Sequence, residues 1–158
     1  MKVQLIDKVL LPLVNKFYKA NRARSRAKSS DRVWVIKQQG EIVAALRVVQ
    51  IAGNEFLTGV QVAEQWQGKG VATLMLQQVF AILSGQAVDG EAVVQPLAKP
   101  CYTFPYLHLI DFYTKLGWRV ITKEQLPVNL HTRYERYCGQ GRDIGVMVYH
   151  PNKTIIAR

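Results

Sequence analysis

The chain has 158 residues and a net charge of +10 at pH 7, with 49% apolar and 20% charged residues. These values predict one folded domain over residues 1–158 and exclude an intrinsically disordered chain. No apolar run approaches the roughly 18 to 20 residues of a membrane-spanning helix, and the first residues lack the uncharged core of a secretory signal. With two cysteines, no CxxC pair and no HxxxH spacing, we expect no disulfide framework, no metal site and a cytoplasmic location.

The first half of the chain has the pattern of a strand, a helix and three further strands. Apolar residues at helical spacing predict a helix from about residue 8 to 19, with Pro12 in its first turn or at a kink. The segment Asn21–Asp31 is polar and basic, which is typical of a loop or a short helix. Turn residues at 39–40 and 53–54 separate three strand-forming runs and predict an antiparallel meander. The expected strands are Met1–Ile6, Arg32–Lys37, Ile42–Gln50 and Glu55–Ala63.

The second half alternates helices and strands. One face of Gly70–Ser84 collects apolar residues at helical spacing, and Pro105 favours the start of a second helix that ends at Gly117. Pro127–Asp143 has the composition of a long loop. Strands are expected at Glu91–Leu97, Trp118–Thr122 and Ile144–His150. The strand–helix–strand order in the middle indicates one parallel pairing within an otherwise antiparallel sheet, so the predicted fold class is α+β.

The most informative segment is the turn between an apolar strand and an amphipathic helix at Val60–Thr73, with the sequence VQVAEQWQGKGVAT. Glycines let the backbone approach a ligand closely, and the first amides of the following helix favour a phosphate or pyrophosphate. A P-loop is excluded because Gly70 follows Lys69 where that motif has Ser or Thr. A dinucleotide-binding turn is disfavoured because Thr73 replaces the third glycine. A turn that merely starts a helix is the remaining alternative.

Two motifs resemble those of the GNAT acyltransferase superfamily. The turn fits the pattern (Q/R)xxGx(G/A) in two registers, one from Gln65 to Gly70 and one from Gln67 to Ala72. About forty residues later, LIDFYTKLGW at residues 109–118 resembles the family's FYxKxGF helix, which ends on glycine and leads into a strand. The resemblance covers nearly the whole chain. It implies a GNAT fold, with a mixed, mostly antiparallel sheet of six to seven strands, a central splayed parallel pair and three to four flanking helices.

The same resemblance implies acetyl-CoA as the co-substrate. In the family the coenzyme lies where two parallel strands splay apart, and here these would be Glu55–Ala63 and Glu91–Leu97. Backbone groups of the first strand would pair with the pantetheine arm, and the glycine-rich turn would hold the pyrophosphate. The expected coenzyme contacts are Val60, Gln61, Val62, Gln67, Gly68, Lys69, Gly70, Val71, Ala72 and Thr73.

The family reaction is direct attack of a neutral primary amine on the thioester in a ternary complex, which needs a base, an oxyanion donor and an acid for the leaving thiolate. Tyr113 matches the position of the tyrosine that protonates the thiolate in many members, although it also lies on an apolar helical face. No residue matches the family base cleanly. Glu55 is the first candidate, with His108, Asp111 and a water chain as alternatives. Cys101 is expected to be a packing or cleft-wall residue.

The resemblance places the acceptor site at Asn21–Asp31 and Leu126–Asp143, where much of the positive charge lies. Residues 1–28 hold eight bases and one acid, a net +7, and the remaining 130 residues hold a net +3. An acceptor with a carboxylate or phosphate would suit arginine, whereas a solvated basic loop explains the same charge without any ligand. The candidate acceptor residues are Arg22, Arg24, Arg26 and Tyr134, with Lys28, His131, Arg133, Arg136 and Tyr137 in the same segments.

The sequence therefore predicts an acetyl-CoA-dependent N-acetyltransferase that acts on a small-molecule or protein amine, with an acidic acceptor as one option and no membrane partner. A second copy of the chain, forming a homodimer, is the other partner considered. A catalytically weak GNAT-fold regulator that binds acyl-CoA is the first alternative function. A basic nucleic-acid-binding protein is the second, disfavoured because the sequence has no recognition-helix motif and no aromatic RNA-binding motif.

Overall fold

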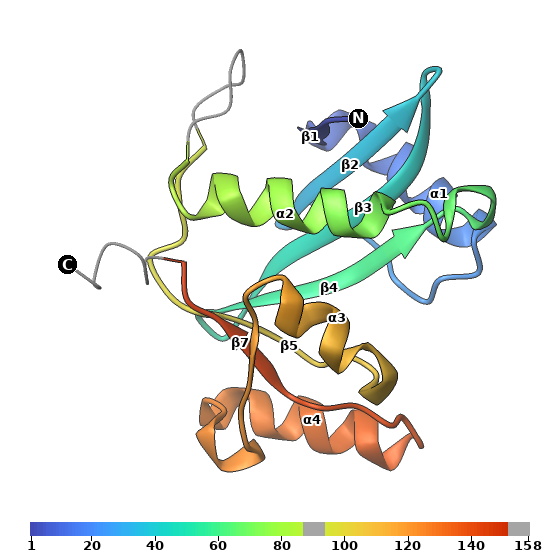
Figure 1. Cartoon of the computed structure of the whole chain (residues 1–158). Helices are drawn as coiled ribbons and strands as arrows, with labels where there is room; N and C mark the ends of the chain where they lie inside the picture. The colour runs from blue at the N-terminus through green and yellow to red at the C-terminus, as the bar shows by residue number, and fades with distance from the viewer. Residues whose placement is uncertain (87–93, 152–158) are drawn as a thin grey trace.

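A computed structural model describes residues 1–86 and 94–151 and contains one seven-stranded sheet (Figure 1). The strand order is β1-β2-β3-β4-β5-β7-β6. All neighbouring strands are antiparallel except β4 and β5, which are parallel, so the predicted α+β class and mixed sheet are confirmed. The strands are β1 (Val3–Leu5), β2 (Arg32–Gln38), β3 (Glu41–Ile51), β4 (Asn54–Val62), β5 (Cys101–Thr103), β6 (Arg119–Val120) and β7 (Met147–Tyr149).

Four α-helices cover the two faces of the sheet: α1 (Leu11–Ala20), α2 (Val71–Leu83), α3 (Ile110–Lys115) and α4 (Val128–Gly139). Figure 1 shows α2 crossing in front of the central strands, with α1 behind them. Successive side chains of a strand point to opposite faces. Leu57 of β4 packs in the cluster around α2 and α3, whereas its neighbour Phe56 packs against Leu130 of α4. Likewise Leu46 of β3 packs in the α2 cluster and Ala45 packs with α1. Helices α2 and α3 therefore share one face, and α1 and α4 share the other.

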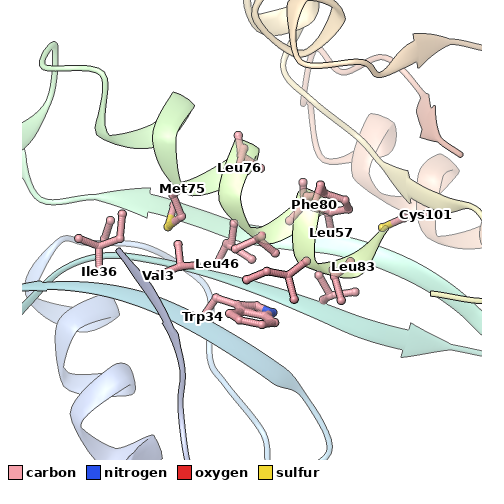
Figure 2. Packing of buried hydrophobic residues seen from close by; sticks show 14 of the residues in the cluster. Val3, Trp34, Ile36, Leu46, Leu57, Met75, Leu76, Phe80, Leu83 and Cys101 are labelled. Carbon is pink, nitrogen blue, oxygen red and sulfur yellow. The ribbon is translucent and has the colours of Figure 1, made fainter. Parts of the chain in front are cut away.

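The main core lies between α2 and the sheet (Figure 2). Helix α2 supplies Met75 and Leu83 from its predicted apolar face, together with Leu76 and Phe80, and all four are fully or nearly buried. They pack against strand residues such as Trp34, Ile36, Leu46 and Leu57. This packing fixes the axis of α2, so its N-terminus is held at a defined place beyond the end of β4.

Most predicted elements occur within a few residues of their expected positions. A 3₁₀ turn at Lys8–Leu10 precedes α1, which leaves Pro12 in the first helical turn where its missing N–H costs nothing. The helix expected from Pro105 begins with another 3₁₀ turn, Leu107–Leu109, before α3. Within the described residues, no helix combines the length and apolar character needed to cross a bilayer.

Two predictions are wrong. The parallel partner of β4 is β5 at Cys101–Thr103, not a strand at Glu91–Leu97. Residues 91–93 lie outside the described residues, and 94–97 form no strand. Pro96 has no N–H to donate to a strand partner, and the next amide, that of Leu97, donates instead to the carbonyl of Leu83 at the end of α2 (2.8 Å).

The second wrong prediction is the long loop at Pro127–Asp143, which contains helix α4. Leu130 is fully buried in this helix and Tyr134 and Tyr137 are half-buried, at the i, i+4, i+7 spacing of one helical face. Charged residues lie between them in the sequence, so the composition of the segment resembles that of a loop and conceals this helical spacing.

Candidate active site

The central parallel pair is short. Only Glu55 with Cys101 and Phe56 with Tyr102 are in register, and the buried Thr103 hydroxyl then donates to the carbonyl of Leu57 (2.9 Å). Beyond this bond β5 ends, whereas β4 continues to Val62. From Thr58 onward β4 therefore has an open edge on the β5 side among the described residues.

A β-bulge lies at the start of this open edge. Pairing with β3 steps from Ala45 opposite Gln61 to Arg47 opposite Thr58, so β4 carries one extra residue. Gly59 has a left-handed backbone with φ of +67° in this stretch. A Cβ there would meet the Tyr18 hydroxyl at 2.7 Å and the Arg47 Nε at 3.0 Å, so the bulge requires glycine.

The backbone of β4 after the bulge directs some of its peptide groups to the open side. The amide of Ala63 donates to the carbonyl of Val43 (2.8 Å), so Val62 and Ala44 form a non-hydrogen-bonded pair. The N–H and C=O of Val62 consequently face away from β3. The C=O of Val60 does too, because the N–H of the same peptide group, that of Gln61, faces β3. The peptide groups of Gln61 face β3.

Two glutamine side chains reach back to this edge. The amide nitrogens of Gln61 and Gln67 donate to the Val62 carbonyl at 3.2 and 2.9 Å. Gln67, which the sequence motif places in the coenzyme turn, thereby ties that turn to the end of β4.

The glycine-rich turn ends at the N-terminus of α2. Gly68 and Gly70 both have left-handed backbone, with φ of +76° and +79°, and a Cβ on either would meet no atom within 4 Å. The first intrahelical bond runs from the Leu74 amide to the Gly70 carbonyl (3.0 Å). The amides of residues 71–73 precede that bond and have no partner within the helix. Lys69 is exposed and lies over the Trp66 ring at 5.4 Å. The turn is thus an open, electropositive helix end.

Tyr113 lies on α3 and is 5% exposed, with its ring edge-on to Phe112 and Trp118. Burial raises its pKa to about 12, so the phenol keeps its proton at neutral pH. Its hydroxyl makes no hydrogen bond to any described residue, and it is not among the fully buried polar atoms without a partner. It is therefore a protonated phenol with an uncommitted hydroxyl.

Glu55 is held by neighbours on both carboxylate oxygens. Oε1 forms an ion pair with Arg32, and Oε2 accepts a bond from Gln50 (3.3 Å). Glu55 is 7% exposed and lies beside Cys101 at the closed end of the parallel pair. Four residues of extended strand, about 13 Å, separate it from Gly59. The alternative bases His108 and Asp111 are exposed, and His108 stacks with Tyr106.

Cys101 is a buried core residue. Burial raises the pKa of its thiol, and the charge of Glu55 raises it further. A thiol held protonated in this way is a poor nucleophile, in agreement with the packing role expected for it.

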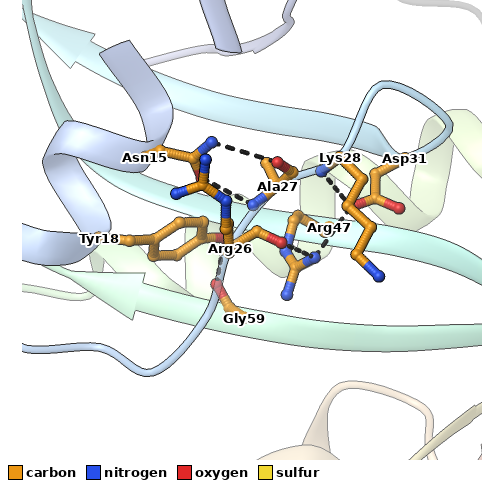
Figure 3. Close-up of polar contacts among 8 residues, drawn as sticks. All are labelled: Asn15, Tyr18, Arg26, Ala27, Lys28, Asp31, Arg47 and Gly59. Carbon is orange, nitrogen blue, oxygen red and sulfur yellow. Dashed lines mark hydrogen bonds and ion pairs between the residues drawn. The ribbon is translucent and has the colours of Figure 1, made fainter. Parts of the chain in front are cut away.

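The segment between α1 and β2 is fixed by buried polar contacts (Figure 3). Arg47 donates to the Arg26 carbonyl (2.8 Å) and pairs with Asp31 (2.9 Å). The Tyr18 hydroxyl donates to the Gly59 carbonyl (2.7 Å), and desolvation raises the pKa of Tyr18 to about 12. Asn15 exchanges two hydrogen bonds with the backbone of Ala27.

These contacts set which side chains of the segment point outward. Ala23 and Ser25 are half-buried and Ala27 is buried, and they alternate with exposed arginines. An ideal Cβ on Gly59 would come within 3.0 Å of the Ser25 hydroxyl, so the segment runs past the bulge of β4. The exposed arginines are Arg22, Arg24 and Arg26.

The last predicted acceptor residue, Tyr134, lies on α4, away from that segment in the sequence. It is half-buried with its ring edge-on to Phe104 (5.3 Å between centroids). Burial, and then a hydrogen bond to Cys138, raise its pKa. Phe104 follows β5 directly and also packs edge-on against Phe56 of β4.

Comparison with a family model identifies the fold. Residues 29–120 match the acetyltransferase (GNAT) domain. The chain belongs to this family. The predicted GNAT resemblance, drawn from two short motifs, is thus confirmed. No curated protein matches the sequence.

Several solved structures share the fold. The GNAT-family acetyltransferase of Staphylococcus aureus Mu50 has a TM-score of 0.61 at 13% identity, covering 94% of this chain and 97% of that one. Rv2747 of Mycobacterium tuberculosis, solved in complex with CoA, has a TM-score of 0.65 at 10% identity, covering 94% and 98%. A mutant of the spermidine N-acetyltransferase SpeG of Vibrio cholerae has a TM-score of 0.60 at 10% identity, covering 97% and 96%.

Several residues of this region were not found from the sequence. Thr103 closes the parallel pair, Tyr18 bonds Gly59 in the bulge, and Arg47 bonds Arg26 and Asp31. Each of these partners lies far away in the chain. Arg142 follows helix α4, which was predicted as a loop. In residues 1–86 and 94–151 no group of three His, Cys, Asp or Glu side chains is arranged to hold a metal ion.

Proposed function

We propose that the protein is an N-acetyltransferase that moves the acetyl group of acetyl-CoA to a primary amine by direct attack in a ternary complex. The observation that carries the proposal is the continuous open edge of β4, which leads from the Gly59 bulge past Val60 and Val62 to the electropositive start of α2. The neighbour Rv2747, solved in complex with CoA, supports coenzyme binding by this fold.

In this proposal the pantetheine arm adds to the open edge like an extra strand. The Val60 carbonyl and the Val62 amide face the open side, where they would bond the amides of the arm, and Gln61 and Gln67, which bond the Val62 carbonyl, border the same edge. The pyrophosphate is bound by the glycine-rich turn, where backbone amides and a helix dipole favour an anion. The binding residues of the turn are Gly68, Lys69, Gly70, Val71, Ala72 and Thr73.

The chemical step joins the amine nitrogen to the thioester carbon and breaks the carbon–sulfur bond. The amine loses one proton and the coenzyme thiolate gains one, so the reaction needs a route for each. We assign the second proton to Tyr113, whose hydroxyl is protonated and uncommitted. The proton of the amine leaves through Glu55 or through water. Water is favoured because both carboxylate oxygens of Glu55 are already bonded, one to Arg32 and one to Gln50.

The acceptor enters, in this proposal, on the sheet face that carries α1 and α4, opposite α2. The segment with Arg22, Arg24 and Arg26 borders the bulge on this face, and Tyr134 packs on Phe104 beside the open edge. The spermidine acceptor named for the Vibrio neighbour is a polycation. A chain with a net charge of +10 and arginines on this face is electrostatically unsuited to such an acceptor.

Release of free thiol from acetyl-CoA in the presence of a panel of primary amines tests the activity, and initial rates at varied acetyl-CoA and amine test the ternary complex. Intersecting double-reciprocal lines are expected. Parallel lines would point to a covalent acyl-enzyme and overturn the proposed mechanism.

A regulator that binds acyl-CoA without turnover is the second candidate, favoured by the fully partnered carboxylate of Glu55. It predicts a rise in thermal stability with acetyl-CoA but no thiol release with any amine. No stabilisation by any CoA would remove both functions.

A further inference from the structure

A cluster of arginines surrounds one tyrosine at the end of α4. Arg133 donates a hydrogen bond to the Tyr137 hydroxyl (3.2 Å). The guanidinium of Arg142 lies over the Tyr137 ring, 4.2 Å from its centroid, and that of Arg136 lies 5.9 Å from the same centroid. Arg133 and Arg142 are half-buried, whereas Arg136 is exposed. Two forked cations are therefore held around a single aromatic ring.

These two arginines lack an acidic partner among the described residues. The nearest acid along α4, Glu135, is paired with Lys123 (2.8 Å), and Asp143 forms no ion pair with its neighbour Arg142. The Nε atoms of both Arg133 and Arg142 are buried and make no hydrogen bond. A buried N–H without an acceptor is costly, and each guanidinium presents further donors in a planar fork. The cluster has unmet capacity for an anion.

The cluster is linked to the segment that follows β5, where the open edge of β4 begins. Tyr134 and Tyr137 pack edge-on against Phe104, which follows β5. The residues after Arg142 are bonded to the chain that leads into α3: the Leu107 amide donates to the Asp143 carbonyl (3.0 Å), and Tyr106 pairs with Ile144. The same connection carries Tyr113 six residues further along. The cluster is thus joined directly to the chain that leads from the end of β5 into α3.

We infer that Arg133 and Arg142, held around Tyr137, bind a carboxylate or phosphate group on the amine acceptor. The role in acceptor binding rests on the proposed function, whereas the binding of an anion by these arginines does not. Arginine forks bind both oxyanions in a bidentate manner, and the stacking on Tyr137 pre-orders the side chains. The site lies on the acceptor face and not on the coenzyme face, so it is separate from the pyrophosphate turn.

Binding can be tested without turnover. The ¹H–¹⁵N signals of arginine Nε–H groups are followed while inorganic phosphate or glutarate is added at constant ionic strength, with assignments from Arg133→Lys and Arg142→Lys. The two assigned signals should shift saturably, and the signal of the exposed Arg119, assigned from Arg119→Lys, should not. Signals that shift linearly and together with that of Arg119, or not at all, would overturn the anion site.

Acceptor choice is tested with matched amines. Each ω-amino acid, from glycine to 6-aminohexanoate, is compared with the n-alkylamine of the same chain length. At one or more lengths the amino acid should show a KM at least tenfold lower. Arg142→Met should remove this preference, whereas Arg119→Met should keep it, with both variants shown to be folded by thermal unfolding.

The two proposals fail in different ways. Equal use of amino acids and alkylamines would overturn the acceptor role while leaving the acetyltransferase activity in place. Saturable arginine shifts without any thiol release would support the anion site and count against the acetyltransferase.

Discussion

Alanine at Gly70 perturbs the start of α2, and alanine at Gly53 provides a matched control. Both glycines have left-handed backbone, with φ of +79° and +83°, and a Cβ at either would meet no heavy atom within 4 Å. Backbone strain of about 1–2 kcal/mol is therefore expected in both variants. Each kcal/mol lowers the Tm of a chain of this size by roughly 2–4 °C. The two variants should lose similar stability and remain folded at 25 °C.

Only Gly70 stands at the proposed pyrophosphate site. The new methyl group would project beside the free amides of residues 71–73 and hold the phosphate away from at least one of them. A hydrogen bond to a charged group contributes about 1.5–3 kcal/mol. Loss of one such bond should raise the Kd for CoA roughly 10- to 100-fold.

Isothermal titration calorimetry with CoA at 25 °C measures this difference. Gly53→Ala should bind CoA within about twofold of the parent, because Gly53 lies in the hairpin turn before β4, at the opposite end of that strand. Equal Kd values for the parent and Gly70→Ala would refute the argument that the start of α2 binds the pyrophosphate.

The remaining predictions concern Tyr113, Glu55 and alkaline stability. Tyr113→Phe should lower kcat about 100-fold in stopped-flow or steady-state assays with little change in acceptor KM. Because the Tyr113 pKa is about 12, the loss should be the same at every pH from 6 to 9, and a loss confined to one end of this range would contradict the assignment. Glu55→Gln should lower Tm by several degrees, because Arg32 loses its partner, and should leave the acidic limb of the pH–rate profile unchanged; disappearance of that limb would identify Glu55 as the base. The contribution of the buried tyrosines to the free energy of unfolding should be constant up to about pH 9 and should then fall between about pH 10 and 12. Tyr18 and Tyr113 have folded-state pKa values of about 12 against about 10 when unfolded, so each favours the folded state only while protonated and contributes up to about 2–3 kcal/mol. Urea unfolding of Tyr18→Phe and Tyr113→Phe should show a shallower decline, and an unchanged decline would refute the assignment.

Local patterns were sufficient for the elements that carry strong periodicity or a turn motif. The apolar face of α2 and the glycines before it are contiguous in sequence, so the glycine-rich turn at the start of α2 could be located from local residues. The β2–β4 meander was found for the same reason, since each strand is long and each turn contains glycine.

The remaining elements depend on contacts between distant residues. Strand β5 has three residues, too few to show a period of two, and it is defined by its pairing with Glu55 and Phe56. The ion pair of Glu55 with Arg32 joins residues 23 positions apart, so a carboxylate that resembles a free base in the sequence is in fact partnered. Helix α4 did have a local signal, the apolar spacing of Leu130, Tyr134 and Tyr137, which its many charged residues obscured.

Much of the excess positive charge lies on the sheet face that carries α1 and α4. Asn15 of α1 bonds the backbone of Ala27 in the segment that carries Arg22, Arg24 and Arg26, and Ala27 packs in the α1 cluster. The cluster around Tyr137 belongs to α4, which packs on the same face through Leu130. Two segments more than a hundred residues apart therefore bring to one face arginines that form no ion pair with any described residue, whereas the proposed coenzyme turn precedes the helix that covers the other face. Solubility alone requires no such segregation, whereas the proposed acceptor, with its own negative charge and entering opposite the coenzyme, would account for it.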